Sequence, residues 1–471
     1  MPDRARHPLA VLVVLALVPA LAIAALWTVA ESRAADDSSA PATTTTFVPP
    51  APLTTPVLSV RRQPGALALD QREDVLVASL ATLFGAVDGA SCAAVSVDDR
   101  PVGSVNPALP VMPASTLKLV TTAVGLDVLG ADHRFVTEVR GATPVDGVVE
   151  GDLYLVGGGD PVLSEAWFTQ PTFGRKRPPI HTTSAEQLAD AIVAAGVTTI
   201  TGDLVGDGSR YDEERYPPTW GSDLRGTLDA QPIGALAIND SVSTNGAIAS
   251  DPALSAATTL RRLLRERGVT VQGDASTGVA PAGPPLASVA SAPLSELVNE
   301  ILATSDNIAA EMLLKELGFA AGLGGTRDAG LQVVHTRLGE WGVSMAGVAL
   351  VDGSGLSRDN RITCDALLGV LRHGDVDDPV GQGLATGGQA GTTLVDVFTG
   401  AGLSGVLRAK TGSLTGVKAL AGYFPAGTEE VAFVLVLNGD AAAASVERWT
   451  QLTDALLATA AVPGAEAWAA P

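Results

Sequence analysis

The sequence predicts one α/β domain that is split by a large β-rich insertion. Helix and hairpin patterns fill residues 60–140, and helical and strand patterns return over 291–465, whereas short β-like pieces alternate with turns over 141–290. At 471 residues, the chain has enough material for two or three domains with a substantial core. We therefore expect the two flanking segments to fold together and the insertion to form a separate unit.

The composition excludes several classes of protein. The chain carries 30 basic and 51 acidic side chains, a net charge of −21, which argues against a nucleic-acid partner because phosphate binding requires clustered Lys and Arg. With 46% apolar and 17% charged residues, it is neither a disordered protein nor a coiled coil. Its five histidines form no H-E-x-x-H or similar spacing, and the glycine run at 157–159 lacks the third glycine of a dinucleotide fingerprint. We therefore predict no metal site and no cofactor.

The N-terminal residues predict export from the cytoplasm. Arg4 and Arg6 precede an uncharged apolar run over 8–30, whose 23 residues are long enough to cross a bilayer of about 30 Å as a helix. We expect residues 1–30 to be an uncleaved signal-anchor, with a cleaved signal peptide as the alternative. Residues 31–59 are rich in Thr, Pro and Ser and are expected to be an extended tether. The folded body would then act outside the cytoplasm, held at the cell membrane or, after cleavage, secreted.

The first part of the α/β domain is expected to contain a helix, a hairpin and a second helix. An amphipathic pattern predicts a helix over 69–86, and strand-like residues predict a hairpin of 91–97 and 102–105 with a polar turn. The second helix is expected over 115–129, ended by Gly130 as a glycine cap.

The insertion shows a weak internal repeat and two helices. Gly-Asp-Leu begins a β-like piece at Gly151 and again at Gly202. Helices are expected over 185–195, behind the capping residue Ser184, and over 253–267. The second part of the α/β domain follows, with helices over 294–303 and 308–317 (closed by Gly318), adjacent strand patterns over 404–424 and 431–438, and a terminal helix over 444–460.

Ser115 and Lys118 form the first candidate site. They lie three residues apart at the start of an expected helix, so that both side chains share one face. A serine hydroxyl is a weak nucleophile that needs a base, and a lysine serves as one where burial or nearby positive charge lowers its pKa. The helix N-terminus adds N–H groups for an oxyanion. The ordinary alternative is an N-cap serine beside a solvated lysine.

Ser305 and Asn307 form the second candidate site. They flank Asp306 in the short link between two apolar helices, which can hold a hydroxyl and a carboxamide rigidly toward a neighbouring cleft. Ser305 could relay a proton, and Asn307 could bond both a lysine and a substrate amide. The alternative is a plain helix cap, for which these residue types are preferred.

The run Lys410-Thr411-Gly412-Ser413 is the third candidate. It lies within a strand-like segment, where a lysine and hydroxyls at a sheet edge suit a substrate carboxylate. The glycine would permit close approach of another backbone segment. The alternative is an ordinary strand with a solvent-facing lysine.

Together, and in this order, the three segments resemble the S-x-x-K, S-x-N and K-T-G motifs of the penicillin-recognising serine acyltransferases. The chain has only five lysines, and two of them occupy motif positions. The 190-residue interval between Ser115 and Ser305 is far longer than in serine β-lactamases. With further segments at 156–164, 202–212 and 352–363, the chain resembles the D-alanyl-D-alanine carboxypeptidase/endopeptidase family of class C low-molecular-mass penicillin-binding proteins. The resemblance covers most of the chain outside the N-terminal segment and the tether.

The resemblance implies a fold like that of serine β-lactamases and transpeptidases, with an antiparallel sheet flanked by helices. It also implies a serine acyl-enzyme mechanism on peptidoglycan stem peptides. Ser115 would attack the carbonyl between two terminal D-alanines with Lys118 as base, and Ser305 and Lys410 would assist proton transfer to the leaving D-alanine. β-lactam antibiotics should acylate Ser115 as covalent inhibitors.

The resemblance also assigns roles in substrate binding. Asn307 would orient Lys118 and the peptide, and Thr411, Gly412 and Ser413 would belong to the strand that binds the terminal carboxylate. A non-catalytic cell-wall-binding or β-lactam-sensing protein on the same fold is the alternative function.

Other hydrolase classes do not fit the sequence. The E-x-x-x-N spacing of one serine β-lactamase class is absent after Asn307, and no tyrosine supplies the Y-x-N of another. The G-x-S-x-G elbow of α/β-hydrolases is missing because Asp352 precedes Gly353. The two cysteines, Cys92 and Cys364, lie 272 residues apart, where export permits a disulfide and two buried thiols are the alternative.

Overall fold

The computed structural model describes residues 21–31, 64–170 and 177–463, and the chain divides into two units, 1–59 and 60–471. In the first unit, residues 21–31 are helical. The rest of the expected signal-anchor or signal peptide, and nearly all of the expected tether, lie outside the described residues. Within the described ranges, no helix is both long and apolar enough to cross a membrane.

A six-stranded antiparallel sheet forms the centre of the second unit. Its strand order is β13 (Ala385–Thr386), β14 (Arg408–Leu414), β15 (Val417–Ala426), β16 (Glu429–Asn438), β1 (Cys92–Val97) and β2 (Arg100–Val105). The N-terminal hairpin therefore pairs with strands from the C-terminal part of the chain. This confirms the α/β domain interrupted by an insertion.

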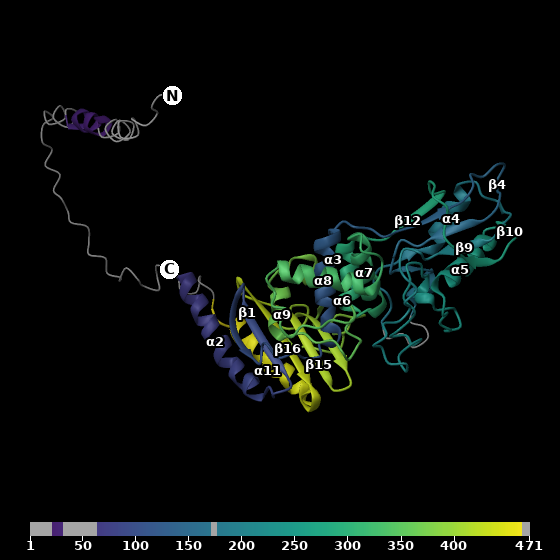
Figure 1. Ribbon diagram of the computed structural model, residues 1–471. Helices are drawn as coiled ribbons and strands as arrows, with labels where there is room; N and C mark the ends of the chain where they lie inside the picture. The colour runs from purple at the N-terminus through teal and green to yellow at the C-terminus, as the bar shows by residue number, and fades with distance from the viewer. Residues whose placement is uncertain (1–20, 32–63, 171–176, 464–471) are drawn as a thin grey trace, which may run out of the picture. The chain divides into compact units, whose positions relative to one another are not determined.

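Helices pack on both faces of this sheet, as Figure 1 shows. One face carries α2 (Pro64–Ala86) and α11 (Ser445–Ala460), the latter preceded by the short helix η5 (Gly439–Ala444). The other carries α3 (Lys118–Leu129), α6 (Leu294–Ala303), α7 (Asn307–Ala320), α8 (Arg327–Glu340), α9 (Cys364–Leu371) and the short α10 (Pro379–Gly383).

The sequence of β16 explains why both faces are covered. Val434 and Val436 pack into the core on the α3 side, and Phe433 and Leu435 pack into the core on the α2 side. Each such side chain, when fully buried, stabilises the fold by roughly 1.5–3 kcal/mol. A strand that is apolar on both faces cannot lie at a solvated surface, so it becomes a central strand.

A disulfide ties the helical layer to the sheet. Cys92 in β1 and Cys364, the first residue of α9, are joined with their Cα atoms 6.0 Å apart, and both are fully buried. The alternative of two free thiols does not occur.

Two expectations about the second part were wrong. Residues 404–424 do not form one strand: β14 and β15 turn at Gly416, whose φ of +71° is favourable for glycine. Gly318 does not end α7, which continues to Ala320. It is instead a packing position, because a Cβ there would lie 2.6 Å from the Ala329 Cβ of α8.

The insertion between α3 and α6 is built on small sheets. The five-stranded sheet has the order β11 (Ala275–Thr277), β9 (Leu204–Asp207), β5 (Leu153–Val156), β3 (Val136–Arg140) and β12 (Ala287–Ala290). The smaller sheets are β10 (Thr270–Val271), β8 (Thr199–Ile200) and β4 (Val148–Val149), and the pair β6 (Leu163–Ser164) and β7 (Thr183–Ser184). Its helices are α4 (Ala185–Ala194), α5 (Pro252–Glu266), η3 (Ala166–Thr169) and η4 (Asn239–Ser241). Because β3 belongs to this sheet, the sheet starts slightly before residue 141, where the insertion was predicted to begin. The limits of the domains remain a prediction.

The internal repeat forms neighbouring parallel strands, with Leu153 of β5 opposite Leu204 of β9. Oδ1 of Asp152 accepts a hydrogen bond from the Asp203 N–H at 2.8 Å, and Oδ1 of Asp203 accepts one from the Asp274 N–H at 2.8 Å. Asp274 therefore marks a third copy of the repeat, which leads into β11. This copy is hidden in the sequence because alanine follows its Gly-Asp pair in place of leucine.

Candidate active site

Ser115 lies in a tight one-turn helix, η2 (Ala114–Leu117), directly before α3. Ala114 has a φ of +48°, an unfavourable conformation for a residue with a side chain, which marks a segment held by its surroundings. Two glycines allow those surroundings to approach closely. A Cβ on Gly355 would lie 1.9 Å from the Ala114 carbonyl oxygen, and one on Gly412 would lie 2.6 Å from that of Pro113.

Lys118 is fully buried, and its Nζ lies among three uncharged groups. Its distances are 3.0 Å to Ser115 Oγ, 2.6 Å to Asn307 Oδ1 and 2.7 Å to the Ser354 carbonyl oxygen. The amide and carbonyl oxygens can only accept hydrogen bonds. A neutral amine that donates its two hydrogens to them therefore directs its lone pair at the Ser115 hydroxyl. The geometry suits proton transfer from Ser115 to Lys118.

The surroundings of Lys118 also lower its pKa. Burial reduces the pKa from 10.5 to about 8, with a small further reduction from Arg177. Asp352, Glu311 and Asp306 act in the opposite direction and keep the pKa from falling further. A substantial fraction of Lys118 is therefore neutral near pH 8.

Ser305 and Asn307 lie where α6 gives way to α7. Ser305 has a φ of +66°, and Asp306 is the actual N-cap, since its carboxylate accepts a hydrogen bond from the Ala309 N–H at 2.9 Å. The carboxamide of Asn307 is oriented at both ends: Oδ1 accepts from Lys118 and Nδ2 donates to the Asp229 carbonyl oxygen at 2.8 Å. Asn307 therefore bridges Lys118 and the insertion.

The 410–413 segment lies on β14, beside the η2 turn that carries Ser115. Lys410 is fully buried rather than solvent-facing, and its Nζ donates to the Thr411 carbonyl oxygen at 2.9 Å. Burial holds the pKa of Lys410 well below its ordinary value, and the neighbouring charges of Lys118 and Arg177 lower it further. Ser413 is exposed, and its hydroxyl accepts a hydrogen bond from Lys418 of β15.

Asn307 contacts Lys118 and Gly412 lies against Pro113, so the three segments meet beside Ser115, and the comparison with known proteins shows the family. The profile of the family described as D-Ala-D-Ala carboxypeptidase 3 (S13) matches residues 83–250 and 243–459. The chain belongs to the S13 family. All the candidate site residues lie within the matched part of the chain.

Individual S13 relatives resemble the chain over most of its length. A D-alanyl-D-alanine carboxypeptidase of Actinomadura sp. (strain R39) is 32% identical over 465 residues, covering 80% of this chain and 82% of that protein. The carboxypeptidase DacB of Mycolicibacterium smegmatis is 32% identical over 438 residues, covering 89% and 90%. The crystal structure of penicillin binding protein 4 (dacB) from Haemophilus influenzae shares the fold, with a TM-score of 0.64, 22% identity, and coverage of 76% of this chain and 93% of that one.

In this S13 protein, the turn over residues 352–357 completes the surroundings of Lys118. The Asp352 carboxylate holds the turn by accepting hydrogen bonds from Gly355 N–H (2.9 Å), Ser357 N–H (2.7 Å), Asn360 Nδ2 (2.7 Å) and Trp220 Nε1 (3.0 Å). In the sequence, this segment supports the family resemblance and lacks the elbow of α/β-hydrolases, and no role was predicted for Ser354. Its contact with Lys118 is made by a backbone carbonyl, which any residue type supplies.

A pocket opens beside Ser305 and Asn307, and residues of the insertion line much of it, including Arg177, Asp229 and Gln231. Nε of Arg177 donates to the Thr304 carbonyl oxygen at 2.6 Å, which places the guanidinium at the α6–α7 link. These residues could not be predicted from the sequence, because no local motif in the insertion indicates that it folds back on the site.

Proposed function

We propose that this chain is a serine D-Ala-D-Ala carboxypeptidase that hydrolyses peptidoglycan stem peptides through an acyl-enzyme on Ser115. The observation that carries the proposal is the environment of Lys118, a buried amine with two uncharged acceptors and one serine hydroxyl within hydrogen-bond distance. Membership of the S13 family and the carboxypeptidase names of its relatives support the enzyme over a non-catalytic binding or sensing protein.

Acylation begins with Ser115. Its Oγ attacks the carbonyl carbon between the two terminal D-alanines, and its proton passes to the neutral Nζ of Lys118. Backbone N–H groups of Ser115 and Ser413 are proposed to stabilise the oxyanion. When the tetrahedral intermediate collapses, the C–N bond breaks, and Ser305 and Lys410 assist in delivering a proton to the amine of the leaving D-alanine. Water then hydrolyses the ester and releases the shortened peptide.

The 410–413 segment is proposed to bind the terminal carboxylate of the substrate. Because burial and nearby cations disfavour the charged form of Lys410 by lowering its pKa, an arriving carboxylate would favour protonation of its amine. Thr411 and Ser413 supply hydroxyls, and the Ser413 hydroxyl already lies against the cation of Lys418. β-lactams, which mimic the D-Ala-D-Ala unit, are expected to acylate Ser115 at the same place.

We further propose that the folded body acts outside the cytoplasm and that residues 1–30 retain it at the cell membrane. The basic residues before the apolar run support this orientation. Fractionation of cells that express the full-length chain tests it: the protein is expected in the membrane fraction, with accessibility to external protease. Recovery of a shortened chain from the medium would favour the cleaved signal peptide.

Fluorescent penicillin and a peptide ending in D-Ala-D-Ala test the catalytic proposal on the purified full-length chain. We expect covalent labelling and release of D-alanine, both abolished by Ser115→Ala with little change in melting temperature. Labelling without D-alanine release would favour the sensor, and the absence of both in the wild type would exclude the proposed reaction.

A further inference from the structure

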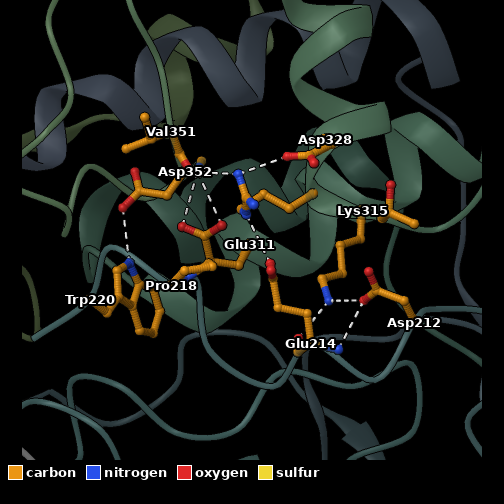
Figure 2. A network of polar contacts seen from close by, with 12 residues as sticks. Asp212, Glu214, Pro218, Trp220, Glu311, Lys315, Asp328, Val351 and Asp352 are labelled. Carbon is orange, nitrogen blue, oxygen red and sulfur yellow. Dashed lines mark hydrogen bonds and ion pairs between the residues drawn. The ribbon is translucent and has the colours of Figure 1, made fainter. Parts of the chain in front are cut away.

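A buried carboxyl pair, Glu311 and Asp352, lies next to Lys118 and has no part in the reaction as proposed. Each is 1% exposed. Glu311 lies one helical turn after Asn307 on α7, so both side chains project from the same face of the helix. Figure 2 shows Glu311 beside Asp352, with Trp220 below. Two buried carboxyl groups are costly to a fold unless they have specific partners.

Glu311 holds the backbone that contacts Lys118. Its Oε1 accepts hydrogen bonds from the Gly353 N–H at 3.0 Å and from the Ser354 N–H at 2.7 Å. The carbonyl of Ser354 in turn accepts from Lys118 Nζ at 2.7 Å, and that of Gly353 accepts from the Thr121 hydroxyl of α3 at 2.7 Å. The turn is therefore fixed on one side by Glu311 and presented on the other side to α3.

The charge of Glu311 also acts on Lys118. Lys118 interacts electrostatically with Glu311 of α7, Asp352 of the turn and Asp306 of the α6–α7 link, which raise its pKa, and with Arg177 of the insertion, which lowers it. Lys410 of β14 also interacts electrostatically with Lys118.

Burial and the neighbouring charged groups shift the pKa of Glu311 itself. Burial and Asp352 raise the pKa of Glu311 to about 7, while hydrogen bonds from the 353–354 turn oppose the rise. Arg327 of α8 is a neighbouring cation that interacts electrostatically with Glu311. The raised pKa of Glu311 and the lowered pKa of Lys118 bring the titrations of the two groups closer together in pH.

We propose that Glu311 is a positioning residue for acyl transfer: it orients Lys118 through the Gly353–Ser354 turn, and its negative charge acts on the transfer of the Ser115 proton to Lys118. The inference rests on the proposed function and adds a residue to it. A purely structural role would require only the hydrogen bonds to the turn, which a neutral side chain can also accept.

Glu311→Gln separates the charge from the hydrogen bonds. The glutamine Oε1 can still accept from both N–H groups, whereas the charge and the weaker contact of Oε2 with the Gly353 N–H (3.1 Å) are lost. The test is the second-order rate of labelling by fluorescent penicillin between pH 6 and 10, on the full-length chain. For Glu311→Gln we expect the rising limb of the profile to move to lower pH by about half a unit or more, because removal of a negative charge lowers the pKa of Lys118. A limb that stays at the wild-type pH would overturn the proposal.

Glu316→Gln is the matched control. Glu316 lies on the same helix and is also 1% exposed, but its carboxylate binds Arg210 at 2.6 Å and 2.8 Å and the Tyr211 hydroxyl at 3.0 Å. The Glu316→Gln variant is expected to have a lower melting temperature, and the rising limb of its pH profile is expected at the wild-type pH. A limb that moves as far as in Glu311→Gln would show that any buried charge on α7 has the effect, and would contradict the specific role.

If Glu311→Gln does not fold, Glu311→Asp keeps the charge and shortens the reach to the turn. Its limb is expected at the wild-type pH, with labelling at least about tenfold slower because the turn is no longer held. A wild-type rate in this variant would overturn the positioning role. A wild-type chain that penicillin does not label at any pH would instead refute the proposed function.

Discussion

Two buried lysines of this protein, Lys118 on α3 and Lys315 on α7, have opposite surroundings. Lys118 is 0% exposed and Lys315 is 2% exposed. Lys118 Nζ lies within hydrogen-bond distance of a hydroxyl, an amide oxygen and a carbonyl oxygen, whereas Lys315 Nζ binds the carboxylate of Asp212 and the carbonyl oxygen of Glu214. Burial alone therefore does not determine the role of a lysine. The role depends on the group that its amine contacts.

A carboxylate in direct contact favours the ammonium form. Lys315 is therefore suited to hold the insertion residue Asp212 against α7 as an ion pair, which Figure 2 shows. The carboxylates of Asp352, Glu311 and Asp306 act on Lys118 electrostatically, while its hydrogen-bond contacts are with uncharged groups, so Lys118 is suited to exchange a proton.

Replacement of the two lysines should give opposite results, and this is the largest expected effect. Lys118→Met removes the base and is expected to slow acylation by penicillin by about a thousandfold or more. Lys315→Met should leave the acylation rate within a few fold and destabilise the protein by about 1–3 kcal/mol, since Asp212 loses its partner but stays partly solvated. Labelling rates and thermal unfolding of both variants measure this. Equal losses of acylation rate in the two variants would contradict the proposed difference between Lys118 and Lys315.

Asn307→Asp should make Lys118 resemble Lys315. A carboxylate at the 2.6 Å contact now made by the Asn307 amide oxygen would favour the ammonium form and raise the pKa of Lys118. We expect acylation at pH 7 to fall by about ten- to a hundredfold and to recover partly at higher pH. A loss that is the same at every pH would mean that Asn307 acts only by binding the substrate.

The wild-type rate should depend on pH through Lys118. With a pKa of about 8, the neutral fraction falls about tenfold for each pH unit below that value, so acylation should rise with pH and level off above it. Lys315→Met should keep the same profile, because Lys315 is no part of the proposed reaction. A profile that is flat between pH 6 and 9 would argue against Lys118 as the base.

The smallest effect on acylation is expected from removal of the Cys92–Cys364 disulfide. Cys92→Ser with Cys364→Ser removes a link that closes a loop of 272 residues, and it should destabilise the fold by about 2–5 kcal/mol. The contacts of Lys118 come from other elements, so labelling at low temperature should persist. Loss of labelling in a variant that remains folded would show that α9 helps to hold the site.

Sequence could predict the parts of the site that depend on local spacing. Ser115 and Lys118 are three residues apart at a helix start, and helical geometry alone brings them together. The link at Ser305 and Asn307 was also expected, because two apolar periodic segments left only a few residues between them. The order of the three motifs then indicated the fold, and the pairing of β1 with β16 agrees with it.

The remaining features of the site and fold could not be predicted, because they depend on packing between segments that are distant in the sequence. The contact of Ser354 with Lys118 uses a backbone carbonyl, so no residue type marks it. In the sequence, nothing distinguishes Glu311 from other acidic residues in helices. Its role as a hydrogen-bond acceptor for the backbone depends on the approach of the 353–354 turn. Gly318 was mistaken for a helix end because its real constraint, the close approach of α8, comes from another helix.

The most direct test of the central claim is mass-spectrometric mapping of the penicillin adduct on the full-length chain and on Lys118→Met. The expected result is one adduct on Ser115 in the wild type and almost none in the variant under the same conditions. An adduct on another residue, or an undiminished adduct on Ser115 in Lys118→Met, would contradict the claim that a buried neutral lysine activates this serine.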